Sequence, residues 1–190
     1  MERIIFINWE RISLVIPEKQ DLEVMYKAIN NVNIIKYLQP IRHNTRETEE
    51  KFLNDKIEKA DKFFVIMQND TNEIIWSVWF NEFDDISRNG IIWICLYDES
   101  KMSKWYGSEA MNLFLKYSFE YIWYNKVKLQ VYSNNPRAIS SYKKCWFREV
   151  WTFKQDLYIM WEYVDNIAME MLRNEWDEIK NKRNGWKNIK

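Results

Sequence analysis

The order of apolar and polar residues predicts alternating strands and helices along the chain. Residues 11–17 alternate apolar and polar side chains, with Leu14 and Ile16 on one face, as expected of a half-buried strand. From Lys19 to Asn30 the apolar residues recur at helical spacing. The same spacing from Asn44 to Lys59, behind a polar capping sequence, predicts a second helix.

The middle of the chain predicts a sheet. Apolar runs at 63–67, 74–80 and 91–97 are separated by turn-forming residues, which favours an antiparallel meander. The next predicted helix, from Ser108 to Tyr121, is apolar over most of its circumference, as is typical of a helix buried against a sheet. The remaining predicted elements are a strand over 126–132, a helix over 136–145, and strands near 147–153 and 165–172. This order predicts an α/β (α+β) fold in one domain, residues 9–173, with a polar tail, residues 174–190.

Two segments between these elements carry candidate chemistry. The first is the loop before the apolar helix, which contains Gly107 and Ser108. A strand that feeds a loop and then a helix directs unpaired backbone N–H groups and the positive end of the helix dipole at one point, which suits a phosphate. The second segment runs Asn134-Asn135-Pro136-Arg137-Ala138 and continues through Tyr142 to Cys145-Trp146-Phe147.

In this order and spacing, the two segments resemble the signature motifs of the GNAT acyl-CoA transferases. The family's first motif is Arg or Gln, two residues, Gly, one residue, then Gly or Ala; here Gly107 matches the second small residue, whereas Met102 and Trp105 depart from the pattern. The second motif, Asn-x-x-Ala followed by Tyr and a Gly-Phe turn, is matched except for Trp146. The resemblance covers roughly residues 11–173. It implies a single-domain GNAT fold with a central mixed, mainly antiparallel sheet, a parallel pair at the cofactor site and helices on both faces.

The resemblance also implies a function. It predicts an N-acetyltransferase that moves the acetyl group of acetyl-CoA to a primary amine, either a protein N-terminus or a small-molecule amine, by direct attack. Tyr142 is then the acid that protonates the departing thiolate, and Asn135 contacts the CoA arm. The backbones of Cys95 and Leu96 bind the thioester at a strand bulge. The pyrophosphate site is predicted at Lys104, Trp105, Tyr106, Gly107 and Ser108.

The base for the acceptor amine is less well defined by the sequence. Many relatives carry Glu at the start of the central strand, where this chain has Ile91. Glu82 is the candidate chosen here, and Asp84 and Asp85 lie close to it. A non-catalytic module that senses CoA or binds a protein is the alternative function, because a bulky Trp105 would hinder the close approach of the backbone to a phosphate.

One feature of the composition is unusual. The chain has 3 Gly and 11 Trp, whereas average usage of about 7% Gly would give roughly 13. Tryptophan also occupies positions that favour glycine, namely Trp9, Trp76, Trp79, Trp93, Trp105, Trp123, Trp146, Trp151 and Trp161. We hypothesise that many of these codons specify glycine in the source and were translated with the wrong genetic code. A protein that is simply rich in tryptophan is the alternative.

The net charge and the numbers of histidine and cysteine residues restrict the partners, metal sites and cellular compartment that are expected. The 28 basic and 28 acidic residues balance, so no global attraction to nucleic acid or to an anionic membrane is expected. With one histidine, His43, no metal site is predicted. The two cysteines lie in apolar segments, and a reduced, cytoplasmic setting is expected. No signal peptide or membrane span is predicted, and the oligomeric state is not indicated.

Overall fold

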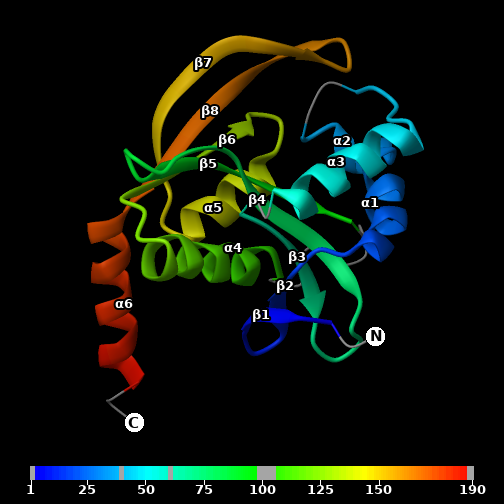
Figure 1. Cartoon of the computed structure of the whole chain (residues 1–190). Coiled ribbons are helices and arrows are strands. Elements are labelled where there is room, and N and C mark those ends of the chain that lie inside the picture. The colour runs from blue at the N-terminus through cyan, green and yellow to red at the C-terminus, as the bar shows by residue number, and fades with distance from the viewer. Residues whose placement is uncertain (1–2, 39–40, 60–61, 98–105, 188–190) are drawn as a thin grey trace.

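A mixed sheet of eight strands forms the centre of the molecule (Figure 1). The computed structural model describes residues 3–38, 41–59, 62–97 and 106–187. The strand order is β1-β2-β3-β4-β5-β6-β8-β7, and every neighbouring pair is antiparallel except β5 and β6. The strands are β1 (Ile5–Asn8), β2 (Ile12–Val15), β3 (Phe63–Gln68), β4 (Ile74–Asp84), β5 (Asn89–Leu96), β6 (Lys126–Tyr132), β7 (Arg148–Ile159) and β8 (Glu162–Leu172).

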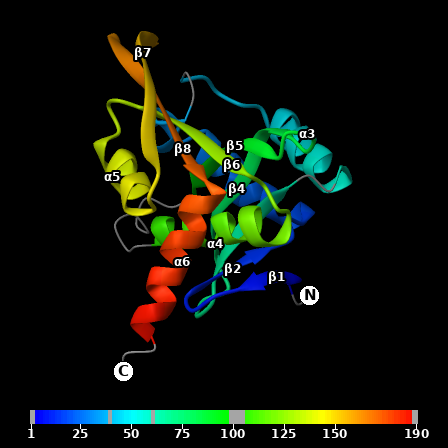
Figure 2. The same cartoon turned by 90° about the vertical axis from the view of Figure 1, so that its left-hand side faces the viewer.

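Helices cover both faces of this sheet, as Figure 2 shows for α3 and α5. One face carries α1 (Leu22–Ile29), α2 (Val32–Ile35) and α3 (Arg46–Glu58). The other carries α4 (Tyr106–Lys116), which continues as a π-helical turn, η3 (Tyr117–Tyr121), and α5 (Pro136–Lys144). A short 3₁₀ turn, η1 (Lys19–Asp21), precedes α1. The predicted mixed, mainly antiparallel sheet with helices on both faces is confirmed.

The pattern of apolar residues explains how α3 and α4 pack against the sheet. In α4 the residues Ala110, Met111, Leu113, Phe114 and Leu115 are all buried, which confirms the prediction that this helix packs against the sheet. The buried side of α3 is narrow, with Leu53 at 1% exposure against the sheet core and Thr45 capping the first turn through a hydrogen bond from the Thr48 N–H. Each layer therefore follows from the periodicity of its own segment.

Four elements differ from the sequence prediction. The strand β1 was not predicted and pairs with β2 at the edge of the sheet. The strands β7 and β8 extend to Ile159 and Glu162, past the predicted ends. The end of this hairpin reaches beyond the helical layers and residues 154–163 are mostly exposed, so apolar alternation does not mark it. The polar tail begins as α6 (Arg173–Lys187), whose Trp176 and Ile179 are buried in the main core. A division of the chain at residue 173 stays a prediction.

The end of α5 bears on the excess of tryptophan. Trp146 follows the last helical residues with a φ of 69°. Its N–H donates to the Lys143 carbonyl, and the Phe147 N–H donates to the Tyr142 carbonyl, both at 3.0 Å. These two hydrogen bonds and the contact between the Tyr142 and Phe147 rings form a Schellman motif. Its left-handed position is usually glycine, because a Cβ atom disfavours positive φ.

The same conflict recurs elsewhere. Trp123 and Trp161 also have positive φ values, 58° and 70°, and their side chains are 59% and 88% exposed. Trp76 and Trp79 bury an indole N–H that has no hydrogen-bond partner among the described residues. In contrast Trp176, which the hypothesis does not include, is buried and donates its N–H to Glu120 at 3.1 Å. These observations support the hypothesis that the former positions are glycine under the source's genetic code.

We predict that Trp146→Gly stabilises the protein as written. Relief of one left-handed non-glycine residue is expected to raise the free energy of unfolding by about 1 kcal/mol, measured by urea unfolding. Trp176→Gly is the control, since loss of a buried aromatic side chain should lower stability by about 3 kcal/mol or more. A Trp146→Gly variant that unfolds more easily than its parent contradicts the interpretation, as does a gene without UGA at this codon.

Candidate active site

The candidate site lies where two central strands separate. The ladder between β5 and β6 is parallel and pairs only residues 89–91 with 126–128. Both strands continue beyond that point, to Leu96 and Tyr132, without pairing to each other. Backbone N–H groups of β5 that point toward β6 therefore have no strand partner there. The bulge predicted on β5 at Cys95 and Leu96 is not seen in the described strand pairings; the register shift beside β5 lies on β4, between Phe80 and Glu82.

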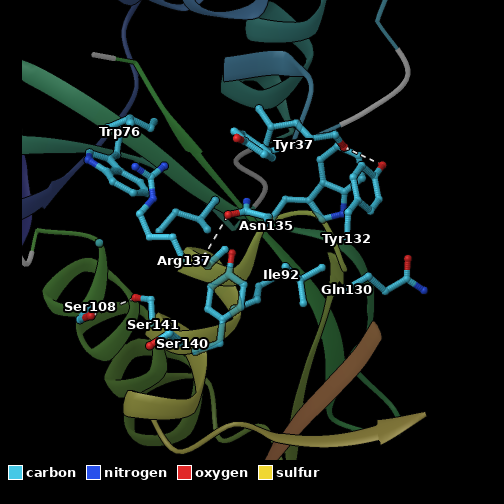
Figure 3. A pocket seen from close by; sticks show the side chains of 18 of the residues that line it. Tyr37, Trp76, Ile92, Ser108, Gln130, Tyr132, Asn135, Arg137, Ser140 and Ser141 are labelled. Carbon is cyan, nitrogen blue, oxygen red and sulfur yellow. Dashed lines mark hydrogen bonds between the residues drawn. The ribbon is translucent and has the colours of Figure 1, made fainter. Parts of the chain in front are cut away.

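A cavity of about 410 Å³ opens at this separation (Figure 3). Its walls come from the two separated strands, from the first residues of α4, from α5, and from the segment that follows α2. Among the described residues that line it, the charged side chains are Arg137 and Lys144, both positive. The cavity thus joins an opening in the sheet to the beginnings of two helices.

The start of α4 forms one end of the cavity. Gly107 and Ser108 line it, and the Ser108 hydroxyl is 3.0 Å from the Ser141 hydroxyl of α5. Gly107 packs closely on Trp76, because a Cβ atom at residue 107 would lie 3.0 Å from the Trp76 Cη2 atom. The first-turn residue Glu109 accepts hydrogen bonds from the Arg11 backbone at 3.1 Å and side chain at 2.8 Å, which ties α4 to the strand β2. Because the first turn of an α-helix leaves N–H groups without intrahelical partners, this end of the cavity is suited to an anion.

The helix α5 forms a second wall. Asn135 caps it by accepting a hydrogen bond from the Ala138 N–H at 3.1 Å, and Pro136 occupies the first turn. Arg137, Ser141 and Lys144 follow at helical spacing and all line the cavity. A guanidinium and an ammonium group on one helix face, next to the start of α4, are suited to bind phosphate.

Tyr142 lies on the same helix and lines the cavity from its inner side. Its ring packs on Phe147 in an edge arrangement at 6.2 Å between centroids, so the Schellman motif at the end of α5 also orients this side chain. Burial, with a smaller effect of the nearby Cys145 thiol, raises the pKa of Tyr142 well above its ordinary value. The hydroxyl therefore keeps its proton at neutral pH and is able to donate it.

Aromatic side chains line the other side of the sheet opening. Tyr37, Trp93 and Tyr132 contribute to the cavity there, together with Leu38. The Tyr132 hydroxyl donates to the Leu38 carbonyl at 3.2 Å, which joins β6 to the segment after α2 (Figure 3). The opening therefore has a phosphate-compatible side and an aromatic side.

The structure brings together part of the predicted site. Leu96, Gly107, Ser108, Asn135 and Tyr142 all line the cavity.

The other predicted residues lie elsewhere. The Cys95 side chain does not line the cavity and is buried under the helices of the opposite face, where desolvation and then the charge of Glu49 raise its thiol pKa to about 12. The predicted contact of its backbone with the thioester stays a prediction. Tyr106 begins α4 beneath the Arg11 guanidinium and does not line the cavity. Glu82 is exposed on β4 and also does not line it. Lys104 and Trp105 lie outside the described residues.

Several cavity residues were not predicted. Arg137 and Lys144 follow from the helical period that begins at Pro136, a signal that the sequence contains. Tyr37 and Tyr132 come from segments that are distant in the sequence, joined by the hydrogen bond from Tyr132 to Leu38 across 94 positions, and no local pattern links them. In the described part of the chain, no group of three or more His, Cys, Asp or Glu residues is placed to hold a metal ion. No helix in that part is long and apolar enough to cross a membrane.

Comparison with known proteins agrees with this geometry. Residues 11–148 match the model of the acetyltransferase (GNAT) domain. The spermidine N(1)-acetyltransferase of Vibrio cholerae is 27% identical over 160 residues, which cover 84% of this chain and 91% of that protein. An uncharacterized N-acetyltransferase of Bacillus subtilis is 27% identical over 164 residues, covering 84% and 92%.

Solved structures share this fold. The spermidine N-acetyltransferase of Vibrio cholerae in complex with CoA and spermine has a TM-score of 0.81 at 25% identity and covers 87% of this chain and 98% of its own. A GNAT acetyltransferase from Bacillus anthracis, at 21% identity, shares the fold with a TM-score of 0.78 over 89% of this chain and 99% of its own. The chain therefore belongs to the GNAT family of acetyl-CoA-dependent N-acetyltransferases.

Proposed function

We propose that this chain acetylates a primary amine of a small molecule, with Tyr142 as the catalytic acid. The observation that carries the proposal is the single cavity that contains the sheet opening, the start of α4 and the Tyr142 side chain. The names of the relatives favour a polyamine as the acceptor. Peptide N-termini are the other primary amines to be tested.

The cavity residues fit acetyl-CoA on chemical grounds. The N–H groups at the start of α4, with Arg137 and Lys144, match the charge of its pyrophosphate. The unpaired part of β5 offers backbone N–H groups to a carbonyl oxygen in the sheet opening. When bound, acetyl-CoA supplies an acyl group already activated as a thioester.

The chain's own residues then position the two substrates and protonate the departing thiolate. Residues of the aromatic side hold the acceptor against the sheet opening and exclude water. Backbone N–H groups of β5 stabilise negative charge that develops on the carbonyl oxygen. Tyr142 donates its proton to the departing sulfur, since its raised pKa keeps the hydroxyl protonated. Glu82 stays a candidate base only if it acts through water, because it does not line the cavity.

We predict that Tyr142→Phe lowers kcat by about a hundredfold or more, the usual effect of removing a general acid. Acetyl-CoA binding should be unchanged, because the phenyl ring keeps the packing on Phe147. Release of free thiol during turnover, on a panel of polyamines, other small amines and N-terminal peptides, measures the first effect, and calorimetry measures the second.

The matched control is Tyr158→Phe, which removes a hydroxyl from an exposed position on β7. Equal kcat in the parent and the Tyr142→Phe variant would exclude Tyr142 as the acid. A parent that binds acetyl-CoA but acetylates no amine on the panel would favour the non-catalytic module.

A second prediction concerns the start of α4. In Gly107→Val, the new side chain meets the Trp76 ring, so the helix start or the ring must shift. Acetyl-CoA affinity is expected to fall about tenfold or more, the loss equivalent to roughly one charge-assisted hydrogen bond. The double variant Gly107→Val with Trp76→Ala frees the space and should recover part of the affinity. Calorimetric titration with acetyl-CoA checks both, and parent-like binding by Gly107→Val refutes this placement.

A further inference from the structure

The hairpin of β7 and β8 carries an irregularity beside the aromatic side of the cavity. Between Phe153 and Leu157 the register shifts, so that residues 154–156 of β7 oppose Asp165 of β8. Gln155 adopts a positive φ of 53°, and its N–H donates to the Asp165 carboxylate at 2.9 Å. Lys154 pairs with the same carboxylate at 2.8 Å. Asp165 is thus used to hold the bulge in place.

The next carboxylate, Asp156, has a different environment. Its Oδ2 accepts a hydrogen bond from the Asn166 side chain at 3.0 Å. The Asn166 amide also donates to the Gln130 side-chain oxygen, at a longer 3.4 Å. No cationic side chain lies within ion-pair distance of Asp156 in the described part of the chain. A negative charge is therefore held here by a neutral amide.

Asn166 itself has an unsatisfied atom. Its side chain is only 7% exposed, and its Oδ1 is buried without a hydrogen-bond partner among the described residues. Rotating the amide would not resolve this, since Oδ1 would then face the Asp156 carboxylate. A buried acceptor without a donor costs about 1–3 kcal/mol, so a donor from outside the chain is the expected partner.

This cluster is continuous with the cavity. Gln130 lines the cavity directly. Asn166 is the register partner of Tyr132, so the two side chains lie on the same face of the sheet. Desolvation raises the pKa of Tyr132, and the charge of Asp156 raises it further. The carboxylate is therefore within electrostatic reach of a side chain that lines the cavity.

We propose that Asp156, Asn166 and Gln130 bind a second, non-reacting ammonium group of the acceptor. All three present acceptor oxygens, and Asp156 adds a negative charge, whereas the charged lining residues at the phosphate side, Arg137 and Lys144, are positive. An ammonium is the complementary group, because it supplies three N–H donors and a positive charge. This inference rests on the proposed function. It makes the acceptor a diamine or polyamine whose second, non-reacting amine binds at the β7 bulge.

The test compares amines that differ only in the second charge. Putrescine and n-butylamine have the same four-carbon chain, and each is titrated calorimetrically into the full-length enzyme saturated with CoA. The parent should bind putrescine about tenfold more tightly, as expected for one charge-assisted hydrogen-bonded contact. Asp156→Asn should remove this difference and leave n-butylamine binding unchanged.

The control is Glu162→Gln, which removes one negative charge from the exposed end of the same hairpin. It should keep the preference for putrescine. Equal binding of the two amines by the parent, a preference that survives Asp156→Asn, or an equal loss in Glu162→Gln each overturns the proposal.

Acetyl transfer, measured on the same samples, separates this inference from the proposed function. Preferential putrescine binding without acetylation means that the second site exists and the proposed function is wrong. Acetylation of both amines with no preference in binding means that the proposed function holds and the second site does not.

Discussion

The parting of β5 from β6 is the constraint on which the site depends. A parallel ladder that stops at Ile91 and Lys128 leaves strand backbone unpaired in the middle of a sheet, where such groups are normally satisfied. This arrangement is stable only if a ligand or neighbouring side chains complete the opening. Here α4 and α5 close one side and aromatic residues close the other. The unpaired backbone is the place where we propose that a thioester carbonyl binds.

The two helices at this opening are held by separate local devices. The ion pair between Arg11 and Glu109 ties the start of α4 to β2, and Asn135 caps the start of α5. The Schellman motif ends α5 and orients Tyr142 through Phe147. Catalysis by a general acid requires that its position vary little. The occurrence of tryptophan at the left-handed position of this motif therefore concerns the active site as well as stability.

Positive and negative side chains lie on different sides of the cavity. Positive side chains lie at the end where phosphates are expected, and the Asp156 carboxylate of the neighbouring hairpin lies beyond the aromatic side. Under the proposals made above, a cationic acceptor and an anionic co-substrate are attracted to opposite sides of one opening. The aromatic walls between them are compatible with ammonium groups, since tyrosine and tryptophan rings attract cations.

The sequence by itself determined the elements and the family. The pattern of apolar residues predicted the meander and the buried helix, because those segments contact the core, and the Asn-Pro motif predicted α5. The two motifs located Gly107, Asn135 and Tyr142, because these residues act through local backbone geometry that depends on neighbours in the chain. Only the tertiary structure decided the rest. The hydrogen bond of Tyr132 to Leu38, the exposure of Glu82 and the cluster of Asp156, Asn166 and Gln130 arise from strands and loops distant in sequence, whose register is set by packing across the sheet.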